Sequence, residues 1–574
     1  MEYPALKAQK ERSELLRVFG GLDRRDVIPE GTFCDMKNLT SLHYPVLATR
    51  PARGMLDIQG KVTGLADKDG LCYTEGEALV IGGYRVPLRL SSEGEKTLVS
   101  MGAYVIVMPD KKYVNTADLN DYGAIEATVT TTETVSFSLC TADGEAMEDV
   151  TVGAYAPPEP ESGALWMDTS GQVHTLKRFS ADSGIWSAVV STYVRISSPG
   201  IGVPFSVHDG VRISGVTPTA LADLNASAVI CACGDDYIVI RGVTDEYALQ
   251  SEPVTVERRM PALDFLIESE NRLWGCRYGP DRDGTVVNML YASRLGDFKN
   301  WECFEGISTD SYAVAVGSDG AFTGAVTYLG YPTFFKEGCM HKVYGNMPSA
   351  FRVQTTACRG VRGGCAKSLA TVNEVLYYVS RSGVCAYDGS LPVEISEALG
   401  ALTCRTAAAG ALGARYYLSL AGEENALLVY DAARGLWHRE DETAARAFCA
   451  SLGEMYFLDG EGRVHTVNGS GRRDRSPIPW YAETGRIGME EPEKQRVSRL
   501  ELCMGLAVGT RVRIDIQYDS SGVWQPLFAV TGGRIGSFTV PIRPRRCDHF
   551  ALRLSGEGDA KLYSIRKTLV KGGA

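Results

Sequence analysis

Short apolar runs recur at nearly even spacing along the second half of the chain. Each run contains an adjacent pair of aromatic residues and ends at a turn rich in glycine and aspartate. The pairs start 43, 39 and 40 residues apart, at Phe334-Phe335, Tyr377-Tyr378, Tyr416-Tyr417 and Tyr456-Phe457. A period near forty residues with two or more short strands per period is typical of β-propeller blades. We therefore predict a β-propeller, with six or seven blades.

The same pattern begins near the N-terminus and is then interrupted. Residues 64–83 and 96–116 each alternate apolar and polar positions around a central turn, which predicts a β-hairpin in each range. Similar apolar runs resume at 261–279. We place the first blades in residues 55–124 and the remainder of the propeller in residues 259–469.

Residues 125–258 differ in character from the blades on either side. The proline-rich stretch 154–163 cannot belong to a central strand and is typical of an exposed loop. The rest predicts one or two small β modules, in one of which Trp166 and Trp186 lie on strands that cover one another. An insertion of this size fits a surface loop, because the entropy of loop closure rises slowly with length.

The two ends of the chain predict separate regions. Residues 1–54 form an N-terminal arm, with a short polar helix over 8–17 and an irregular segment over 19–54 that wraps over other elements. Residues 470–574 contain five alternating strands about ten residues apart, the pattern of a β-sandwich or jelly roll. The predicted fold is therefore all-β: a propeller interrupted by a small β insertion and followed by a C-terminal β-sandwich.

Composition narrows the classes of function. The 574 residues suffice for two to four domains, and the 62 glycines suit many tight turns. A net charge of −11 argues against a dedicated nucleic-acid binder, but it suits a surface that DNA passes without sticking. The 15 cysteines are scattered without a C-x-x-C pair, so we expect reduced, buried thiols and no structural zinc.

Sequence motifs that would indicate catalysis or cofactor binding are missing. The glycine-rich stretch 359–368 has Val361 and Ala366 where a phosphate-binding loop requires glycine. The histidines are dispersed, there is no G-x-S-x-G motif, and the acidic clusters lie in polar loops. We therefore predict no catalytic residue, no cofactor and no metal. The sequence has no apolar stretch long enough to span a membrane.

The densest unusual string is residues 268–279. Asn271 and Arg272 precede a predicted strand in which Trp274 shares a face with Tyr278. Gly275, directly after Trp274, permits a close approach of a neighbouring backbone. We interpret this string as a packed blade whose arginine is anchored to a carboxylate. Its structural motif comprises Asn271, Arg272, Leu273, Trp274 and Gly275.

Residues 19–54 carry a resemblance to a known family. They begin with Phe19-Gly20-Gly21, continue to Asn38-Leu39 and end with the stretch from Pro45 to Gly54. This order resembles the N-termini of bacteriophage virion proteins of the tail-nozzle or packaged-DNA-stabilisation type. The strings at 268–279, 291–301 and 309–326 are similar to strings in structural proteins of phages and prophages of gut Firmicutes.

The resemblance implies a structural protein, made in the cytoplasm of a bacterial host and located in the virion tail. Such a protein forms a ring, expected to be a hexamer, that contacts portal, adaptor or other tail proteins. The ring retains packaged DNA and conducts it during ejection, without sequence-specific binding. Two alternatives stay open: a tail protein that binds a host receptor or glycan, with Trp166 and Trp186 as glycan contacts, and a propeller glycosidase or lyase.

Overall fold

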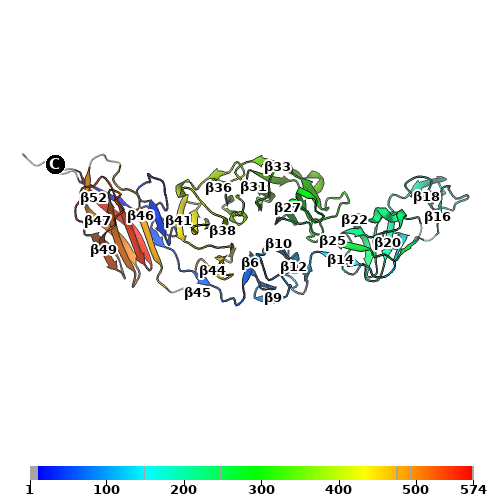
Figure 1. The fold of residues 1–574 in the computed structure, drawn as a ribbon, viewed down its shortest axis with the longest axis horizontal. Helices are drawn as coiled ribbons and strands as arrows, with labels where there is room; N and C mark the ends of the chain where they lie inside the picture. The colour runs from blue at the N-terminus through cyan, green and yellow to red at the C-terminus, as the bar shows by residue number, and fades with distance from the viewer. Residues whose placement is uncertain (1–10, 148, 246, 474–475, 490–493, 572–574) are drawn as a thin grey trace, which may run out of the picture. The chain divides into compact units, whose positions relative to one another are not determined.

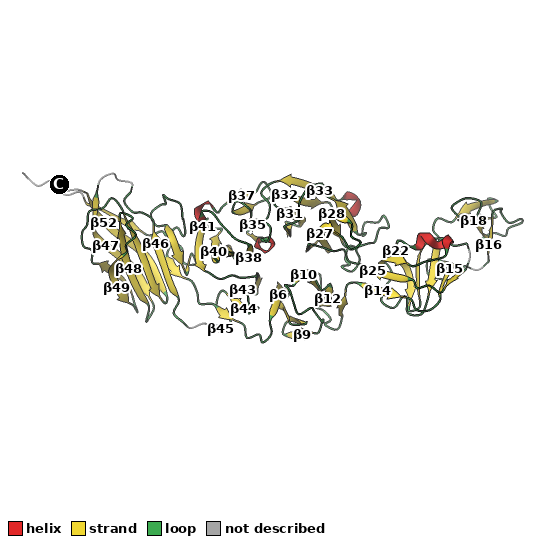
Figure 2. Cartoon of the chain, in the orientation of Figure 1, coloured by secondary structure: helices red, strands yellow, loops and turns green. Residues whose placement is uncertain are grey.

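The computed structural model describes residues 11–147, 149–245, 247–473, 476–489 and 494–571. Nearly all regular structure in these residues is β-strand, with short 3₁₀ turns between strands (Figure 2). The 3₁₀ turns are η1 (Thr219–Leu224), η2 (Pro348–Ala350), η3 (Ala366–Ser368) and η4 (Glu397–Leu399). The chain divides into two compact units, of which unit 1 comprises residues 1–97, 335–340 and 356–574, and unit 2 comprises 98–334 and 341–355.

Unit 1 contains four small antiparallel sheets; consecutive strands pair in the first three, and the fourth also takes in a strand from near the N-terminus. The first two sheets are β6 (Val62–Asp67), β7 (Leu71–Glu75), β8 (Ala78–Ile81) and β9 (Tyr84–Val86), then β34 (Ala370–Val372), β35 (Val375–Val379), β36 (Val384–Tyr387) and β37 (Val393–Glu394). The third is β38 (Thr406–Leu412), β39 (Arg415–Ala421), β40 (Ala426–Asp431) and β41 (Leu436–Asp441). The fourth is β42 (Ala447–Ser451), β43 (Glu454–Leu458), β44 (Val464–Thr466), β5 (Gly54–Met55) and β45 (Arg472–Arg473).

Unit 2 contains sheets of the same kind. They are β10 (Thr97–Met101), β11 (Tyr104–Met108), β12 (Lys112–Asn115) and β13 (Tyr122–Ala124), then β26 (Phe265–Ser269), β27 (Arg272–Pro280), β28 (Val286–Ala292) and β29 (Tyr312–Ala315). The last, most of which lies in unit 2, is β30 (Gly324–Tyr328), β31 (Tyr331–Lys336), β32 (Cys339–Tyr344) and β33 (Arg352–Ala357). Seven blade-like sheets thus occur in the described residues, and the fold is of the β-propeller type, as predicted.

The four aromatic pairs that revealed the repeat occupy equivalent strands. They lie in β31, β35, β39 and β43, the second strand of each sheet. These strands are largely buried, so the pairs lie in the interior of the fold. Within unit 1, the rings of Tyr377 and Tyr416 are 5.4 Å apart, and Tyr417 packs with Met455 and Phe457 in one core cluster.

Residues 127–258 of unit 2 form an inserted module of two sheets. The larger sheet has the order β14 (Ala127–Thr130), β25 (Thr255–Arg258), β21 (Gly210–Ser214), β22 (Ser227–Gly234), β23 (Tyr237–Arg241), β20 (Tyr193–Ser197), β15 (Val135–Cys140) and β24 (Ala248–Gln250). It encloses an apolar core that includes Phe137 and Ile196. The smaller sheet is β16 (Val150–Gly153), β17 (Leu165–Asp168), β18 (Thr175–Ser180) and β19 (Ile185–Ala188).

The remaining sheets of unit 1 form the C-terminal sandwich, and both take strands from the N-terminal end of the chain (Figure 1). One sheet is β3 (Leu39–Thr40), β4 (Leu47–Thr49), β52 (Ala560–Lys571), β47 (Gln495–Leu506) and β50 (Ile535–Val540), with β1 (Glu11–Leu16) beside β52. The other is β2 (Phe33–Lys37), β46 (Pro479–Thr484), β51 (Phe550–Glu557), β48 (Arg511–Tyr518) and β49 (Gln525–Thr531).

The helix predicted over residues 8–17 is wrong for its described part. Residues 11–16 are strand β1, which pairs with β52 from Glu11 opposite Val570 to Leu16 opposite Ile565. Residues 8–10 lie outside the described residues. A short polar helix here would have no apolar stripe to bury, whereas pairing with β52 satisfies the backbone groups of both strands.

Candidate functional site: a polar clamp around the N-terminal segment

The N-terminal segment, residues 19–55, joins the sandwich to two of the blade-like sheets of unit 1. Its strands β2 and β4 pair with β46 and β52 of the sandwich, whereas β5 pairs with β44 of a blade-like sheet. Backbone hydrogen bonds connect it to β41 as well: the amide of Leu22 donates to Trp437 O and that of Asn38 to Glu440 O, both at 2.6 Å. The segment is therefore held on two sides.

Asn38 is the residue at which these connections meet. Its side-chain amide donates to Pro479 O at 2.7 Å, and its Oδ1 accepts a hydrogen bond from Arg50 Nε at 2.8 Å. Its φ of 57° is left-handed, a conformation that asparagine adopts more readily than most residues. One buried side chain thus links β46 of the sandwich to the N-terminal segment, while its backbone bonds to β41.

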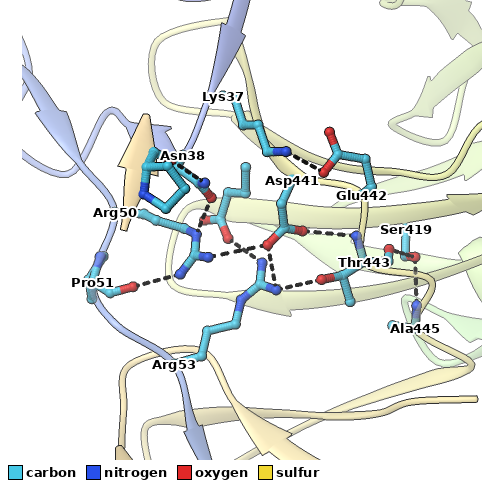
Figure 3. A network of polar contacts seen from close by, with 12 residues as sticks. Lys37, Asn38, Arg50, Pro51, Arg53, Ser419, Asp441, Glu442, Thr443 and Ala445 are labelled. Carbon is cyan, nitrogen blue, oxygen red and sulfur yellow. Dashed lines mark hydrogen bonds and ion pairs between the residues drawn. The ribbon is translucent and has the colours of Figure 1, made fainter. Parts of the chain in front are cut away.

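Arg50 and Arg53 face two carboxylates at the end of β41 (Figure 3). Arg53 contacts Glu440 Oε2 at 2.9 Å and Asp441 Oδ2 at 2.7 Å, and Arg50 contacts the same Asp441 oxygen at 3.3 Å. Thr443 completes the group by accepting from Arg53 and by donating its amide to Asp441 Oδ1 at 3.0 Å. We call Asn38, Arg50, Arg53, Glu440 and Asp441 the clamp.

The charges of the clamp balance in a largely water-excluded place. The exposed fractions of the four charged side chains lie between 5% and 14%. Burial alone would lower the pKa of Arg53, but Asp441 and Glu440 outweigh it and raise the pKa. Burial would likewise raise the pKa of Asp441, but Arg53 and Arg50 hold it below its ordinary value. Removal of one member would leave an uncompensated buried charge.

The residues that carry the family resemblance are those at which the segment makes these contacts. Asn38 and Arg50 belong to the clamp, and a Cβ at Gly54 would lie 1.9 Å from Ser470 O. Gly21 has a φ of 77°, and a Cβ there would lie 2.4 Å from Trp437 O. The motif therefore has a structural reason: side chains at its glycines would collide with neighbouring backbone atoms, and its polar residues bond to the surrounding strands.

The motif predicted at residues 271–275 has a different chemistry. Arg272 is buried and donates to three backbone carbonyls, those of Ser293 at 2.8 Å, Asp310 at 2.6 Å and Ser308 at 2.9 Å. The expected anchor to a carboxylate is thus wrong, because the Asp310 carboxylate instead accepts backbone amides from Glu305, Gly306 and Ile307. Burial lowers the pKa of Arg272, and the nearby Asp310 charge offsets this only in part.

The other members of that motif pack in strand β27 and the turn before it. Leu273 and Trp274 are buried in two different apolar clusters of unit 2. A Cβ at Gly275 would lie 2.5 Å from Leu263 Cδ1, which explains the glycine. Asn271 has a φ of 57° in the turn between β26 and β27, and its backbone N–H donates to Glu268 Oε1. Residues 272–275 thus form the interior of one blade-like sheet, and Asn271 lies exposed in the turn before it.

The two tryptophans predicted as glycan contacts lie together in the small sheet β16–β19. Their rings are 5.5 Å apart in an edge-to-face arrangement. Trp166 is 6% exposed and donates its indole N–H to Gly153 O, while Trp186 is half-buried against Phe179. Trp166 therefore has little surface left for a ligand, and a glycan contact through Trp186 stays a prediction.

A shallow groove of about 610 Å³ crosses the sheet β2–β46–β51–β48–β49. Its lining includes Lys37, Tyr481, Arg511, Arg513 and Glu557. Two of the cations have carboxylate partners, since Lys37 pairs with Glu442 at 2.6 Å and Arg513 with Asp515 at 2.8 Å. The lining also includes the apolar residues Trp480, Val512 and Val530, so the groove mixes apolar surface with nearly balanced charges, which suits a neutral ligand better than a polyanion.

Within the described residues, no cluster of three or more histidine, cysteine or acidic side chains could hold a metal ion. In the same residues, no helix is both long enough and apolar enough to cross a membrane.

No protein-family model and no curated protein matches this chain. Among solved structures, BamB from Moraxella catarrhalis is similar at 12% identity and a TM-score of 0.30, over 73% of this chain and 97% of that one. Sqt1 from Saccharomyces cerevisiae is similar at 9% identity and a TM-score of 0.30, over 72% and 98%. An exo-β-1,3-galactanase from Phanerochaete chrysosporium is similar at 8% identity and a TM-score of 0.22, over 53% and 94%. Similarity this weak says nothing about the chemistry of this chain.

Proposed function

We propose that this chain is a structural protein of a bacteriophage virion. It forms a ring at the tail or head-to-tail channel, retains packaged DNA and conducts it during ejection. One observation carries the proposal: within residues 19–54, which resemble tail-nozzle and packaged-DNA-stabilisation proteins, Asn38, Arg50 and Arg53 form the N-terminal part of the clamp. The resemblance thus includes residues that hold the protein together, a property that a virion part under mechanical load requires.

The clamp suits a part that must resist mechanical load. To separate the sandwich from the blade-like sheets of unit 1, the N-terminal segment must lose either its pairing with the sandwich strands or its pairing with β44 together with its buried ion pairs. Charged groups separated without water cost several kcal/mol each, by the usual order of magnitude for buried ions. The sandwich is therefore fixed to its neighbours, while a flexible linker would let it swing.

The net negative charge of the chain agrees with a role in lining a channel through which DNA passes. A net charge of −11 repels the phosphate backbone and disfavours trapping of the nucleic acid. In a ring, each subunit would contact the next through two different surfaces, in a head-to-tail manner. We expect six subunits, with portal, adaptor or other tail proteins as partners and the virion tail as the location.

The test is the assembly state of the purified chain, alone and mixed with portal and adaptor rings of the same phage or prophage. Native mass spectrometry and negative-stain microscopy should show a ring, or a complex in which this chain caps a partner ring. The variant Arg53→Met serves as a control, since loosening the clamp should weaken assembly without altering any chemistry. A stable monomer that binds none of these rings would refute the proposal.

A second candidate is a tail protein that binds a host glycan, and the groove on the sandwich favours it. The groove presents the aromatic ring of Tyr481 beside polar and charge-paired side chains. Binding of neutral oligosaccharides, measured by calorimetry or NMR, should weaken in Tyr481→Ala if the groove is the site. Binding that weakens in Trp186→Ala instead would place the site in the inserted module. That the chain is not an enzyme stays a prediction.

A further inference from the structure

Two cysteines of unit 1 lie with their sulfur atoms in contact. Cys365 lies in the loop before η3 and Cys404 lies just before β38, and their Sγ atoms are 3.9 Å apart. Cys365 is fully buried and Cys404 is 5% exposed. Although the sequence predicts inert thiols that fill space, this pair is close enough to react with each other.

The surrounding backbone holds the two cysteines close together. A Cβ at Gly364 would lie 2.6 Å from Arg405 O, so the two loops touch at residues next to the cysteines. The Cys365 loop is fixed by Ser368, whose amide and hydroxyl both donate to Cys365 O. A disulfide needs a sulfur–sulfur distance of about 2.05 Å, so small side-chain rotations must bring the two sulfur atoms closer. Because the two loops are held in place, these side-chain rotations are the main movement that the bond requires.

The two thiols differ in their ability to ionise. The two thiols share a hydrogen bond in which either sulfur can be the donor. With Cys365 as the donor, this bond and the Arg362 charge lower the pKa of Cys404 despite its burial. The pKa of Cys365 is raised, first because its proton is held in that hydrogen bond. The thiolate is the nucleophilic form of cysteine, so Cys404 is the sulfur that reacts first.

We propose that Cys365 and Cys404 are an oxidation site, at which a peroxide converts the two thiols into an intramolecular disulfide. The Cys404 thiolate attacks one oxygen of hydrogen peroxide and becomes a sulfenic acid, and the other oxygen leaves as hydroxide, which takes the thiol proton and becomes water. The Cys365 sulfur then attacks the Cys404 sulfur and expels the sulfenic hydroxyl, which leaves as a second water with the Cys365 proton. The two thiols are oxidised by two electrons and the peroxide is reduced to two waters.

The bond would join two neighbouring blade-like sheets. The loop that it closes contains the whole of β34–β37 and ends where β38 begins. Such a cross-link restricts the unfolded chain, and the stabilisation grows with the size of the loop. We therefore expect oxidation to raise the midpoint of thermal unfolding of unit 1 by roughly 5 °C, and a thiol reductant to reverse the shift.

The direct test is a peptide map of the full chain after brief exposure to hydrogen peroxide, with free thiols blocked before digestion. Trypsin alone leaves Cys385 and Cys404 on one peptide, residues 382–405. Addition of a protease that cleaves after glutamate releases residues 398–405, which contain Cys404 alone. The expected product is residues 363–367 linked to residues 398–405, lighter by two hydrogens than the two reduced peptides together.

Three variants provide the controls. Cys404→Ser and Cys365→Ser should each abolish the linked peptide and the reversible thermal shift. Cys385→Ser should leave both unchanged, since that buried thiol bonds to Ser380 Oγ and is not a partner of the pair. Recovery of both peptides fully blocked after peroxide treatment would overturn the proposal. So would a link from residue 365 to Cys385, or a thermal shift that persists in Cys404→Ser.

Discussion

Arg272 in unit 2 is buried and Arg53 in unit 1 is nearly so, but the two guanidinium groups bind different kinds of acceptor. Arg272 donates to backbone carbonyls no more than 38 residues away in the sequence, and burial lowers its pKa. Arg53 faces carboxylates 387 residues and more away, which raise its pKa. The first completes one sheet, whereas the second joins separate regions of the chain. A buried arginine can therefore stabilise either a local fold or a long-range connection, and its acceptors decide which.

The largest expected effect comes from removal of the Arg53 charge. Arg53→Met should lower the free energy of unfolding by about 3–5 kcal/mol at pH 7, because Glu440 and Asp441 then share one cation. The double variant Arg53→Met/Glu440→Met, which restores the charge balance, should recover most of that loss. Urea unfolding measures both, and hydrogen exchange locates the loss in unit 1.

Arg272→Met is the matched comparison for this effect. Its loss should not be recovered by Asp310→Asn, because Arg272 bonds to the Asp310 carbonyl and not to its carboxylate. Recovery in that double variant would mean that the two arginine sites work alike, and the comparison would fail.

The next effect is a pH dependence in unit 1 that has no counterpart at Arg272. Burial lowers the pKa of His438 to about 4, with Asp431 raising it and Arg415 lowering it by smaller amounts. Its unfolded pKa is about 6.5, so the unfolded chain binds the proton more readily between these values. Stability is full above pH 6.5 and falls by about 3 kcal/mol as the pH drops towards 4.

The His438→Gln variant isolates this contribution from that of other titrating groups. The difference in unfolding free energy between wild type and variant, measured by urea at several pH values, should change between pH 6.5 and 4 and be flat above pH 7. A difference that is constant over the whole range would show that His438 titrates normally in the folded chain.

Arginine-to-lysine substitutions separate the need for charge from the need for geometry. Arg272→Lys should cost about 2 kcal/mol, since one ammonium cannot reach three carbonyls that the forked guanidinium reaches. Arg53→Lys should retain at least half of the stabilisation that Arg53→Met loses, because the charge remains. Equal losses at the two positions, measured by urea unfolding, would contradict the distinction.

The smallest effect compares two asparagines with the same backbone conformation. Asn38 and Asn271 both have a φ of 57°, but only the Asn38 side chain makes long-range hydrogen bonds to Pro479 O and Arg50. Asn38→Gly should cost about 1–2 kcal/mol for two lost hydrogen bonds, whereas Asn271→Gly should change stability by less than about 0.5 kcal/mol. The same urea assay measures both, and a larger cost at Asn271 would show that its side chain has an unrecognised role.

Much of the fold follows from patterns that are complete within about ten residues. The aromatic pairs mark the second strand of four sheets because alternation and turn residues act locally. The same reasoning finds the inserted module and the C-terminal sandwich strands.

Local patterns fail where a partner lies far along the chain. The chemistry of residues 11–16 suggested a helix, and only the free edge of β52 made them a strand. The string at 271–275 drew attention by its composition and is an ordinary blade interior. The carboxylates of the clamp gave no signal, because Glu440 and Asp441 lie in an acidic cluster that is typical of a polar loop. The resemblance of residues 19–54 did not indicate what Arg50 and Arg53 would contact.

The sequence by itself thus determined the class of fold, since strand period, turn chemistry and burial alternate over short distances. Only the tertiary structure decided which ends meet: that the N-terminal segment completes the sandwich, that Asn38 lies beside Pro479, and that Cys365 touches Cys404. The physical reason is that pairings over hundreds of residues depend on where whole sheets pack. A local pattern of side chains does not determine where a whole sheet packs.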